Sequence, residues 1–350
     1  MMSLSIGRPS LVDVPAYAPA ATSCAIDLRD NANLWGAPPH AVEAIRALDV
    51  ASLSLYPTVA AGALTAALAI FLGVDRNEVA AGCGSDDLLD AAFRAIAEPG
   101  AVLAHPAPSF SMVPIFARLN GLQPVAVPLA RDGAADAEAM LATGARIIYL
   151  CSPNNPTGTI TPVDVVRRLL RDSDAIVILD GAYAEFAPEV DDLLTQAPGL
   201  GRLLVVRTFS KAWGLAGLRV GYAVGSTDLV RAVRASNGPY KVNALAERAV
   251  AVALERDVGW MRARVADAVS CRVRVTEALR TMGLSPLDSR GNFVSVPVAD
   301  ARTLAARLAS RGVAVRAFVG LPVFGDIVRA GVAPWPVMEQ FLNAWRDVLP

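Results

Sequence analysis

The chain has 350 residues, and because domains of about 150 residues are usual, this length predicts roughly two domains. Hydrophobic residues make up 54% of the sequence, which excludes an intrinsically disordered chain. With 32 Lys and Arg against 33 Asp and Glu the formal net charge is −1, which argues against a protein that binds nucleic acid or another polyanion.

Residues 1–40 are rich in Pro and Ala, and their irregular pattern predicts an N-terminal arm that packs with a smaller C-terminal domain. Residues 41–243 alternate helical patterns with short apolar runs. Runs rich in Val, Ile and Leu that lack strict alternation are typical of parallel strands buried on both faces. The pattern therefore predicts a large α/β domain with a mainly parallel sheet. The predicted strands are 78–81, 101–104, 124–127, 146–151, 175–179 and 203–207.

Helices are expected between these strands at 85–97 and 162–171, the second with Thr161 as its N-cap and Pro162 at its first position. After Asn243 the pattern becomes a long helical stretch, 244–282, with a break near 257–259. Residues 244–350 are thus predicted to form the smaller α+β domain. Its remaining elements are expected to be a strand, a helix, a second strand and a terminal helix at 292–297, 299–310, 313–317 and 336–348.

Neither a membrane span nor a secretory signal is expected. No stretch reaches the roughly 18 uninterrupted apolar residues that a span needs, and the N-terminus lacks a charged region followed by an apolar one. The four cysteines are far apart and form no C-x-x-C motif, and there are only two histidines, so no metal site is expected. We therefore expect a soluble, cytoplasmic protein with reduced thiols.

The segment RTFSKAWGLAGLRVGY, residues 207–222, contains one lysine, Lys211, after an apolar strand and among small residues. A lysine on a surface loop is the ordinary interpretation. However, the segment contains no acidic partner, and Ser210 and Arg219 flank the lysine. A lysine in an apolar, cation-rich pocket has a lowered pKa and can act as a nucleophile. The segment alone leaves both interpretations open.

Two further segments end predicted strands. CSPNNPTG, residues 151–158, contains turn signals, so a structural loop is one interpretation, but loops at the carboxyl ends of parallel strands also bind ligands. ILDGAYAEF, residues 178–186, ends an apolar strand with Asp180, whose carboxylate would be costly to bury without a partner. A Walker-B metal site is excluded because the chain has no G-x-x-x-x-G-K-[ST] loop.

The fourth segment, AGCGSDD at residues 81–87, is a glycine-rich turn from a strand to a helix. Backbone N–H groups and the positive end of the helix dipole suit such a turn to a phosphate, although a plain tight turn is as common. The turn is not G-x-G-x-x-G, and no acidic residue closes a second strand at the expected distance. Both facts disfavour NAD.

Together these segments closely resemble the fold-type I pyridoxal-phosphate enzymes of the aminotransferase class I/II group, and most of all the histidinol-phosphate aminotransferases. The matches follow the family's order over nearly the whole chain. The resemblance implies a large domain with a mixed, mainly parallel sheet flanked by helices, plus a smaller α+β domain. Further matching pieces are AYAP at 16–19, NANLWG at 31–36, Tyr56-Pro57, GCGSDD at 82–87, PYKVN at 239–243, Arg316 and Arg329.

The resemblance implies roles around pyridoxal 5'-phosphate. Lys211 would form the Schiff base with the cofactor aldehyde and then move a proton between the substrate carbon and the cofactor. Asp180 would pair with the pyridine nitrogen and keep it protonated. Asn155 and Tyr183 would bond the 3′ oxygen. Phe110 would stack on the ring, with an ordinary core aromatic as the other interpretation.

The resemblance also implies a phosphate site on the backbone of the 84–86 turn. A charged guanidinium would balance the dianion. Tyr56 would reach the phosphate of a neighbouring subunit, so the implied active unit is a homodimer with shared sites. The residues expected around the phosphate are Gly84, Ser85, Asp86, Thr208, Ser210 and Arg219.

For the substrate, the resemblance implies that Arg329 binds the carboxylate of 2-oxoglutarate and glutamate. Arg316 and Tyr17 would assist with a substrate phosphate, although a surface salt bridge is the other interpretation of Arg316. The asparagines expected to line the site are Asn33, Asn243 and Asn292.

The sequence departs from the family pattern near the substrate entrance. Ala32 and Leu34 replace a Glu and a Pro, Gly181 replaces a common Glu, and GVAPW at 331–335 is unusual. None of these changes removes an expected cofactor contact. They all lie where substrate selection could change.

The sequence therefore predicts transamination of histidinol phosphate with 2-oxoglutarate, giving imidazole acetol phosphate and glutamate. The alternatives of the same fold are an aromatic or biosynthetic aminotransferase and a threonine-phosphate decarboxylase. A non-catalytic, ligand-sensing module is disfavoured, because a chain that had lost catalysis would be expected to lose Lys211 or Asp180, and both are present.

Overall fold

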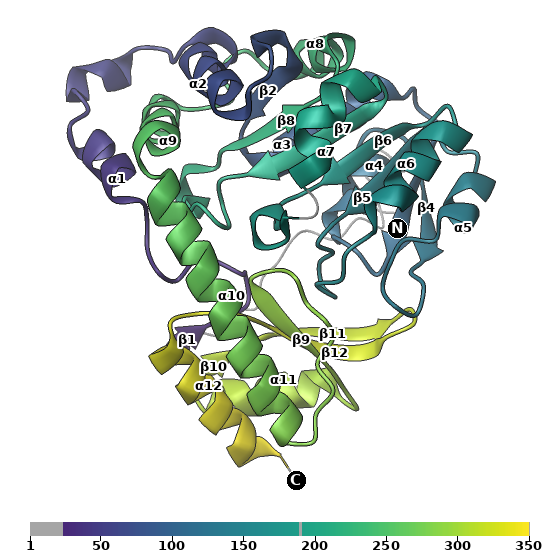
Figure 1. The fold of residues 1–350 in the computed structure, drawn as a ribbon, viewed down its shortest axis with the longest axis vertical. Coiled ribbons are helices and arrows are strands. Elements are labelled where there is room, and N and C mark those ends of the chain that lie inside the picture. The colour runs from purple at the N-terminus through teal and green to yellow at the C-terminus, as the bar shows by residue number, and fades with distance from the viewer. Residues whose placement is uncertain (1–23, 189–190, 350) are drawn as a thin grey trace, which may run out of the picture.

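In the computed structural model, which describes residues 24–188 and 191–349, most of the chain is built around a seven-stranded sheet (Figure 1). The strand order is β2-β8-β7-β6-β5-β3-β4. β8 runs antiparallel to both of its neighbours, and the other pairs are parallel. The strands are β2 (Val79–Gly82), β3 (Val102–Ala107), β4 (Gln123–Pro128), β5 (Ile147–Cys151), β6 (Ile176–Asp180), β7 (Leu203–Thr208) and β8 (Gly221–Val224).

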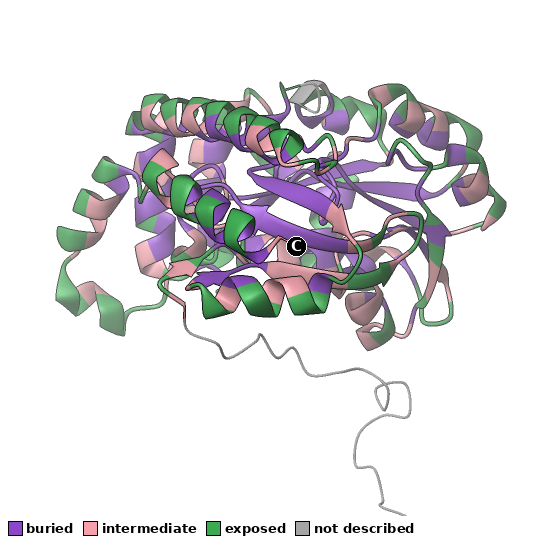
Figure 2. Ribbon diagram, turned by 90° about the horizontal axis from the view of Figure 1, so that it is seen from below, coloured by how far each residue is buried: buried purple, intermediate pink, exposed green. Residues whose placement is uncertain are grey.

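Helices cover both faces of this sheet, and the strands between them are buried (Figure 2). One face packs against α3 (Gly84–Ile96), α4 (Met112–Leu119) and α8 (Thr227–Ser236). All six predicted strands are present, so the mixed, mainly parallel sheet is confirmed. The helices of the opposite core are α2 (Gly62–Leu72), α5 (Ala137–Ala142), α6 (Val163–Asp172), α7 (Asp191–Gln196) and α9 (Ala244–Arg256).

A second, antiparallel sheet of order β11-β12-β9 lies with the C-terminal helices. β12 was not predicted, and the single strand expected at 313–317 is two strands, β10 and β11. The break expected near 257–259 is confirmed, because α9 and α10 meet at Asp257. The elements are β9 (Phe293–Val298), β10 (Val313–Ala314), β11 (Arg316–Leu321), β12 (Gly325–Gly331), α10 (Val258–Thr281), α11 (Ala301–Ser310) and α12 (Trp335–Val348).

The described end of the N-terminal arm pairs with this C-terminal part, because β1 (Ile26–Asp27) runs parallel to β10. The predicted boundaries at residues 40 and 243 stay predictions. Helix α9, which follows Asn243, packs against α1 (Pro39–Arg46) and α2, and α10 leads from there to the smaller sheet (Figure 1). No helix among the described residues is long and apolar enough to span a membrane.

One predicted helix start is wrong. α6 begins at Val163, so Pro162 is its N-cap, and no side chain caps the helix. The Thr161 hydroxyl instead accepts a hydrogen bond from the Ala135 N–H at 3.3 Å. Short 3₁₀ turns complete the fold at Val50–Ser54, Val59–Ala61, Arg76–Glu78, Ala184–Phe186, Ala197–Leu200 and Ala216–Leu218.

Candidate active site

A pocket of about 570 Å³ lies where the carboxyl ends of β5, β6 and β7 face the smaller sheet. Carboxyl ends of parallel strands are the usual ligand side of an α/β sheet. Most of the predicted site residues line this one pocket although they are far apart in the sequence. These are Ser85, Asp86, Phe110, Asn155, Asp180, Tyr183, Thr208, Ser210, Lys211, Arg219, Arg316 and Arg329.

Lys211 is half-buried in the turn after β7, and its Nζ donates a hydrogen bond to the Asp30 carbonyl at 2.7 Å. Nζ also lies 5.6 Å from the centre of the Tyr183 ring. Loss of hydration, and next the charge of Arg329, lower the pKa of Lys211 to about 8. The amine is therefore available in its neutral, nucleophilic form close to physiological pH.

Asp180 ends β6 and is only 3% exposed. The Tyr149 hydroxyl donates to Oδ2 at 2.8 Å, and the Ala182 N–H donates to Oδ1 at 3.0 Å. Burial raises the pKa of Asp180 to about 6, although these hydrogen bonds act in the opposite direction. Such a carboxylate would be stabilised by a protonated ring nitrogen in the pocket.

Tyr149 was missed in the sequence analysis. The available signal was a tyrosine inside a strand predicted to be buried on both faces, since a buried phenol normally finds a hydrogen-bond partner. Asn31 was missed as well. It is 1% exposed, and its side-chain amide donates to the Tyr183 hydroxyl at 3.1 Å. Burial raises the pKa of Tyr183 to about 12, so this phenol keeps its proton.

A cluster of hydroxyl, guanidinium and backbone groups lies at the start of α3. Thr208 Oγ1 donates to Ser210 Oγ at 2.9 Å, and Arg219 Nη1 donates to the same oxygen at 3.2 Å. Helix α3 begins at Gly84 without a side-chain cap, and the first N–H groups of a helix lack intrahelical partners. This combination suits an anion such as a phosphate.

Gly84 does not line the pocket, but its backbone lies next to the Arg219 guanidinium. Its φ is +83°, and a Cβ built there would lie 2.7 Å from Arg219 Nη2. Only a residue without a side chain therefore lets the guanidinium lie against the turn.

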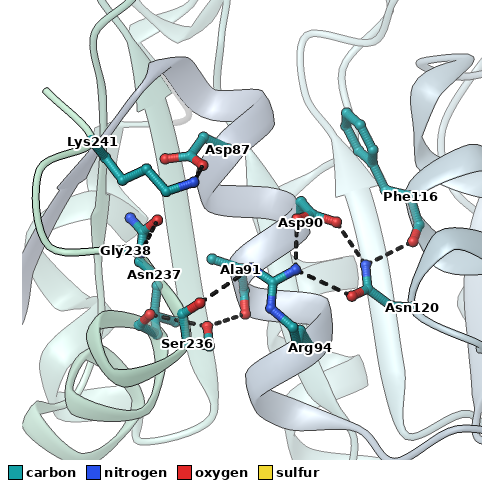
Figure 3. Close-up of polar contacts among 11 residues, drawn as sticks. Asp87, Asp90, Ala91, Arg94, Phe116, Asn120, Ser236, Asn237, Gly238 and Lys241 are labelled. Carbon is teal, nitrogen blue, oxygen red and sulfur yellow. Dashed lines mark hydrogen bonds and ion pairs between the residues drawn. The ribbon is translucent and has the colours of Figure 1, made fainter.

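Polar contacts on the outer side of α3 fix the helix between its neighbours (Figure 3). Asp90 accepts hydrogen bonds from Arg94 and from Asn120, the residue after α4, both at 2.7 Å. Ser236 at the end of α8 donates to the Ala91 carbonyl at 2.6 Å. Near the helix start, Lys241 Nζ lies 2.8 Å from Asp87 Oδ1. Helix α3 is thus held in place from both sides, with the Lys241–Asp87 pair near its start.

Arg316 and Arg329 come from adjacent antiparallel strands and are directly paired partners across β11 and β12. The Arg329 guanidinium hydrogen bonds to Asn155 Oδ1 and to the Arg29 carbonyl. It also lies 5.4 Å from the centre of the Phe318 ring, which lines the pocket. The pocket therefore has two guanidinium groups on the side that the smaller sheet forms.

Four further predicted residues, all in the described part of the chain, do not line the pocket. Asn33 Nδ2 donates to the Ala212 carbonyl at 3.0 Å, and Asn243 caps α9 by accepting from the Ala246 N–H at 2.9 Å. Asn292 Nδ2 donates to the Asn31 carbonyl at 3.0 Å. Tyr56 is 82% exposed. Tyr17 lies outside the described residues.

The family model described as aminotransferase class I and II matches residues 24–334. The chain belongs to this family. It is 32% identical to the histidinol-phosphate aminotransferase of Desulfitobacterium hafniense, over 98% of this chain and 97% of that protein. It is 35% identical to the aromatic amino acid aminotransferase of Corynebacterium glutamicum strain R, over 97% of this chain and 98% of that protein.

The histidinol-phosphate aminotransferase of Sinorhizobium meliloti, solved in complex with pyridoxal-5'-phosphate, has the same fold. Its TM-score is 0.88 at 26% identity, with 99% of this chain and 98% of that chain covered. The fold-type I architecture and pyridoxal 5'-phosphate as cofactor are thus confirmed. This aminotransferase acts on an amino donor and a 2-oxo acid.

The residues of the pocket fit this cofactor. A lysine with a lowered pKa, a carboxyl with a raised pKa and an anion site face the same cavity, as the aldehyde, ring nitrogen and phosphate of the cofactor require. Among the described residues, no three His, Cys, Asp or Glu side chains come together as a metal site would need.

Proposed function

We propose that this aminotransferase transfers the amino group of histidinol phosphate to 2-oxoglutarate, giving imidazole acetol phosphate and glutamate. The observation that carries this proposal is the pairing of Arg316 with Arg329 in the pocket. Like charges directly opposite each other in a sheet repel, so an anion between them would relieve the repulsion. Guanidinium groups also suit phosphate and carboxylate groups, which they can bind through two parallel hydrogen bonds.

The bound cofactor supplies an electron sink for cleavage of the bond between the substrate Cα and its hydrogen. In this proposal Lys211 Nζ would hold the cofactor through its aldehyde and, once free, would move the proton that leaves the substrate Cα. The Asp180 carboxylate would pair with the ring nitrogen and favour its protonated form. Asn155 and Tyr183 would hydrogen bond the 3′ oxygen, and Phe110, which also lines the pocket, would pack on the ring.

In this proposal the cofactor phosphate would bind at the start of α3. It would be held by the N–H groups of Ser85 and Asp86, the hydroxyls of Thr208 and Ser210, and Arg219. Binding at these fixed groups excludes water and orients the reacting atoms against Lys211.

The relatives include histidinol-phosphate aminotransferases and aromatic amino acid aminotransferases, and both support an amino-acid or amino-alcohol substrate. Besides the histidinol-phosphate enzymes, an aromatic amino acid aminotransferase of Rhodococcus jostii is 37% identical over 89% of this chain and 88% of that protein. Aromatic amino acids are therefore the second candidate substrates, and Phe110 and Phe318 line the pocket where a ring could pack. A threonine-phosphate decarboxylase is the third candidate.

A half-reaction panel tests the proposal. The loaded protein is mixed with histidinol phosphate, tyrosine, phenylalanine or threonine phosphate, and the absorbance of the bound aldehyde is followed as it converts to the amine form. We expect histidinol phosphate to give the largest second-order rate constant. A larger constant for an aromatic amino acid would select the second candidate, and CO₂ release without turnover of the 2-oxo acid would select the third.

We also propose that the active unit is a homodimer with shared sites. Tyr56 is exposed, lies outside its own chain's pocket, and stacks on Tyr240 with ring centres 4.7 Å apart. Large apolar side chains around it are exposed as well, as expected of a surface that pairs with a second copy. They are Val50, Leu53, Leu55, Val59 and Ile70.

A cytoplasmic location completes the proposal. All four cysteines are free thiols, in keeping with a reducing compartment.

A further inference from the structure

We propose that Tyr149 is a positioning residue for catalysis, whose hydroxyl fixes the orientation of Asp180 and favours the ionised form of its carboxylate. The inference rests on the proposed role of Asp180 at the cofactor ring nitrogen. Tyr149 itself is fully buried and does not line the pocket, so in this inference it acts on the reaction through Asp180 and makes no contact with the substrate or the cofactor.

The register of the sheet brings the two side chains together. β5 and β6 are parallel, with Tyr149 paired to Ile178 and Cys151 paired to Asp180. Alternate residues of a strand point to the same face, so Tyr149, two residues before Cys151, shares the face of Asp180. Its phenol reaches along this face, and its hydroxyl donates to Asp180 Oδ2 at 2.8 Å.

The two oxygens of Asp180 each have one fixed donor. Oδ1 accepts from the Ala182 N–H at 3.0 Å, and Oδ2 accepts from Tyr149. The first donor belongs to the backbone and is present whatever the sequence, whereas the second depends on one hydroxyl. Two donors on opposite oxygens fix the plane of the carboxylate, and hydrogen bonds to a carboxylate favour its charged form.

None of the surrounding charged groups favours the ionised form of the Asp180 carboxylate as strongly as the Tyr149 hydrogen bond does. Asp86, from α3, raises the pKa of Asp180, and Arg207, from β7, lowers it with a weaker effect than the Tyr149 hydrogen bond. Cys151, on the same strand as Tyr149, is buried, and burial raises its pKa well above the usual range, so its thiol stays neutral. Burial also raises the pKa of Tyr149, which keeps its proton on the phenol as a donor.

The test compares Tyr149→Phe with Ile178→Val. The first removes only the hydroxyl, and the second changes the paired core residue of β6 without touching a hydrogen bond. In the cofactor-free protein, the ¹³C signal of the Asp180 carboxyl is titrated after assignment by its loss in Asp180→Asn. We expect Tyr149→Phe to raise the midpoint by about one pH unit, because an uncompensated buried carboxylate is disfavoured. Ile178→Val should leave it unchanged.

A second readout uses the loaded enzyme. With Asp180 more easily protonated, the acid limb of the kcat profile should move to higher pH in Tyr149→Phe, whereas a merely structural defect would lower kcat equally at every pH. Tyr149→Phe should also weaken cofactor binding several-fold in the native background and leave it unchanged in the Asp180→Asn background.

The outcomes separate this inference from the proposed function. A Tyr149→Phe midpoint equal to that of the native protein would overturn the inference, as would equal weakening of cofactor binding in both backgrounds. Failure of the native protein to bind pyridoxal 5'-phosphate would instead overturn the proposed function. The carboxyl titration of the cofactor-free protein decides the Tyr149–Asp180 interaction in either case.

Discussion

Asp180 is a carboxyl whose ionisation is coupled to the stability of the protein. Its pKa rises from 3.8 to about 6 on folding because the side chain is buried. A raised carboxyl pKa means that the folded state holds the proton more tightly than the unfolded state. The stabilisation that this proton gives is fully present below the unfolded pKa and is lost as the pH rises through the folded one.

We therefore predict that the cofactor-free protein loses stability as the pH rises, and that Asp180→Asn removes this loss. Between about pH 4.5 and about pH 8 the free energy of unfolding of the variant should gain about 2 kcal/mol relative to the native protein. Urea denaturation at a series of pH values measures it. A constant difference across this range would contradict the raised pKa.

Arg316 is expected to bind the phosphate of histidinol phosphate, a group that the aromatic amino acids lack. Arg316→Gln should raise KM for histidinol phosphate about tenfold or more, because a hydrogen bond to a charged group contributes about 1.5–3 kcal/mol. KM for phenylalanine should change little, since this substrate has no phosphate. Arg311→Gln, which removes an exposed ion pair to Asp347, is the control. Equal changes for both substrates in steady-state assays would remove the support for a phosphate site at Arg316.

Sequence reasoning predicted the residues that stand in ordered motifs but not those that meet through the fold. Lys211, Asp180 and Asn155 follow apolar strands, and the structure brings all three into one pocket. Tyr149 stands outside these motifs, and Asn31 begins the NANLWG motif but was given no role, because the significance of each is a contact with a residue of another segment. Asn33 and Asn243 were expected to line the site. The Asn33 side chain instead hydrogen bonds the backbone next to Lys211, and the Asn243 side chain hydrogen bonds the backbone at the start of α9.

The strand-to-helix turn at the start of α3 depends on close approach. A Cβ on Gly84 would lie 2.7 Å from Arg219 Nη2, whereas Gly100, also at positive φ, has nothing within 4 Å of the same point. Both Gly84→Ala and Gly100→Ala have the strain of a left-handed backbone, about 1–2 kcal/mol each. Only the first should displace Arg219.

We expect Gly84→Ala to lower cofactor affinity about tenfold through the displaced charge–phosphate contact, and Gly100→Ala to lower only the melting temperature. Cofactor dissociation constants and thermal unfolding of the two variants measure these effects side by side. Equal cofactor affinity in the two variants would contradict a phosphate site at this turn.

Elements were predictable where burial gives a clear pattern. The runs of Val, Ile and Leu in β5, β6 and β7 are buried throughout, and each was found within a residue or two of its ends. β8 is apolar but only four residues long, whereas β12 mixes Asp326 and Arg329 with apolar residues and has no continuous apolar run. Because β12 was missed, the cross-strand pairing of Arg316 with Arg329 could not be predicted.

At the scale of the whole molecule, the pocket combines residues of both sheets, and the proposed dimer adds a residue of a second chain. Chains with Lys211→Ala and with Tyr56→Ala can be refolded together. With random pairing, half of the dimers contain one of each chain and have one intact site, so about a quarter of the native sites should be restored. Activity at limiting cofactor measures this, and no gain on mixing would contradict sites shared between chains.

The most direct test of the account is chemical trapping at Lys211. The sequence contains only two lysines, Lys211 and Lys241, and Lys241 is paired with Asp87 at 2.8 Å, so it serves as the internal control. The loaded protein is reduced with borohydride, digested and mapped by mass spectrometry. We expect a stoichiometric pyridoxyl phosphate adduct on Lys211 and none on Lys241. An adduct on Lys241 alone, or no adduct on protein saturated with the cofactor, would contradict this expectation.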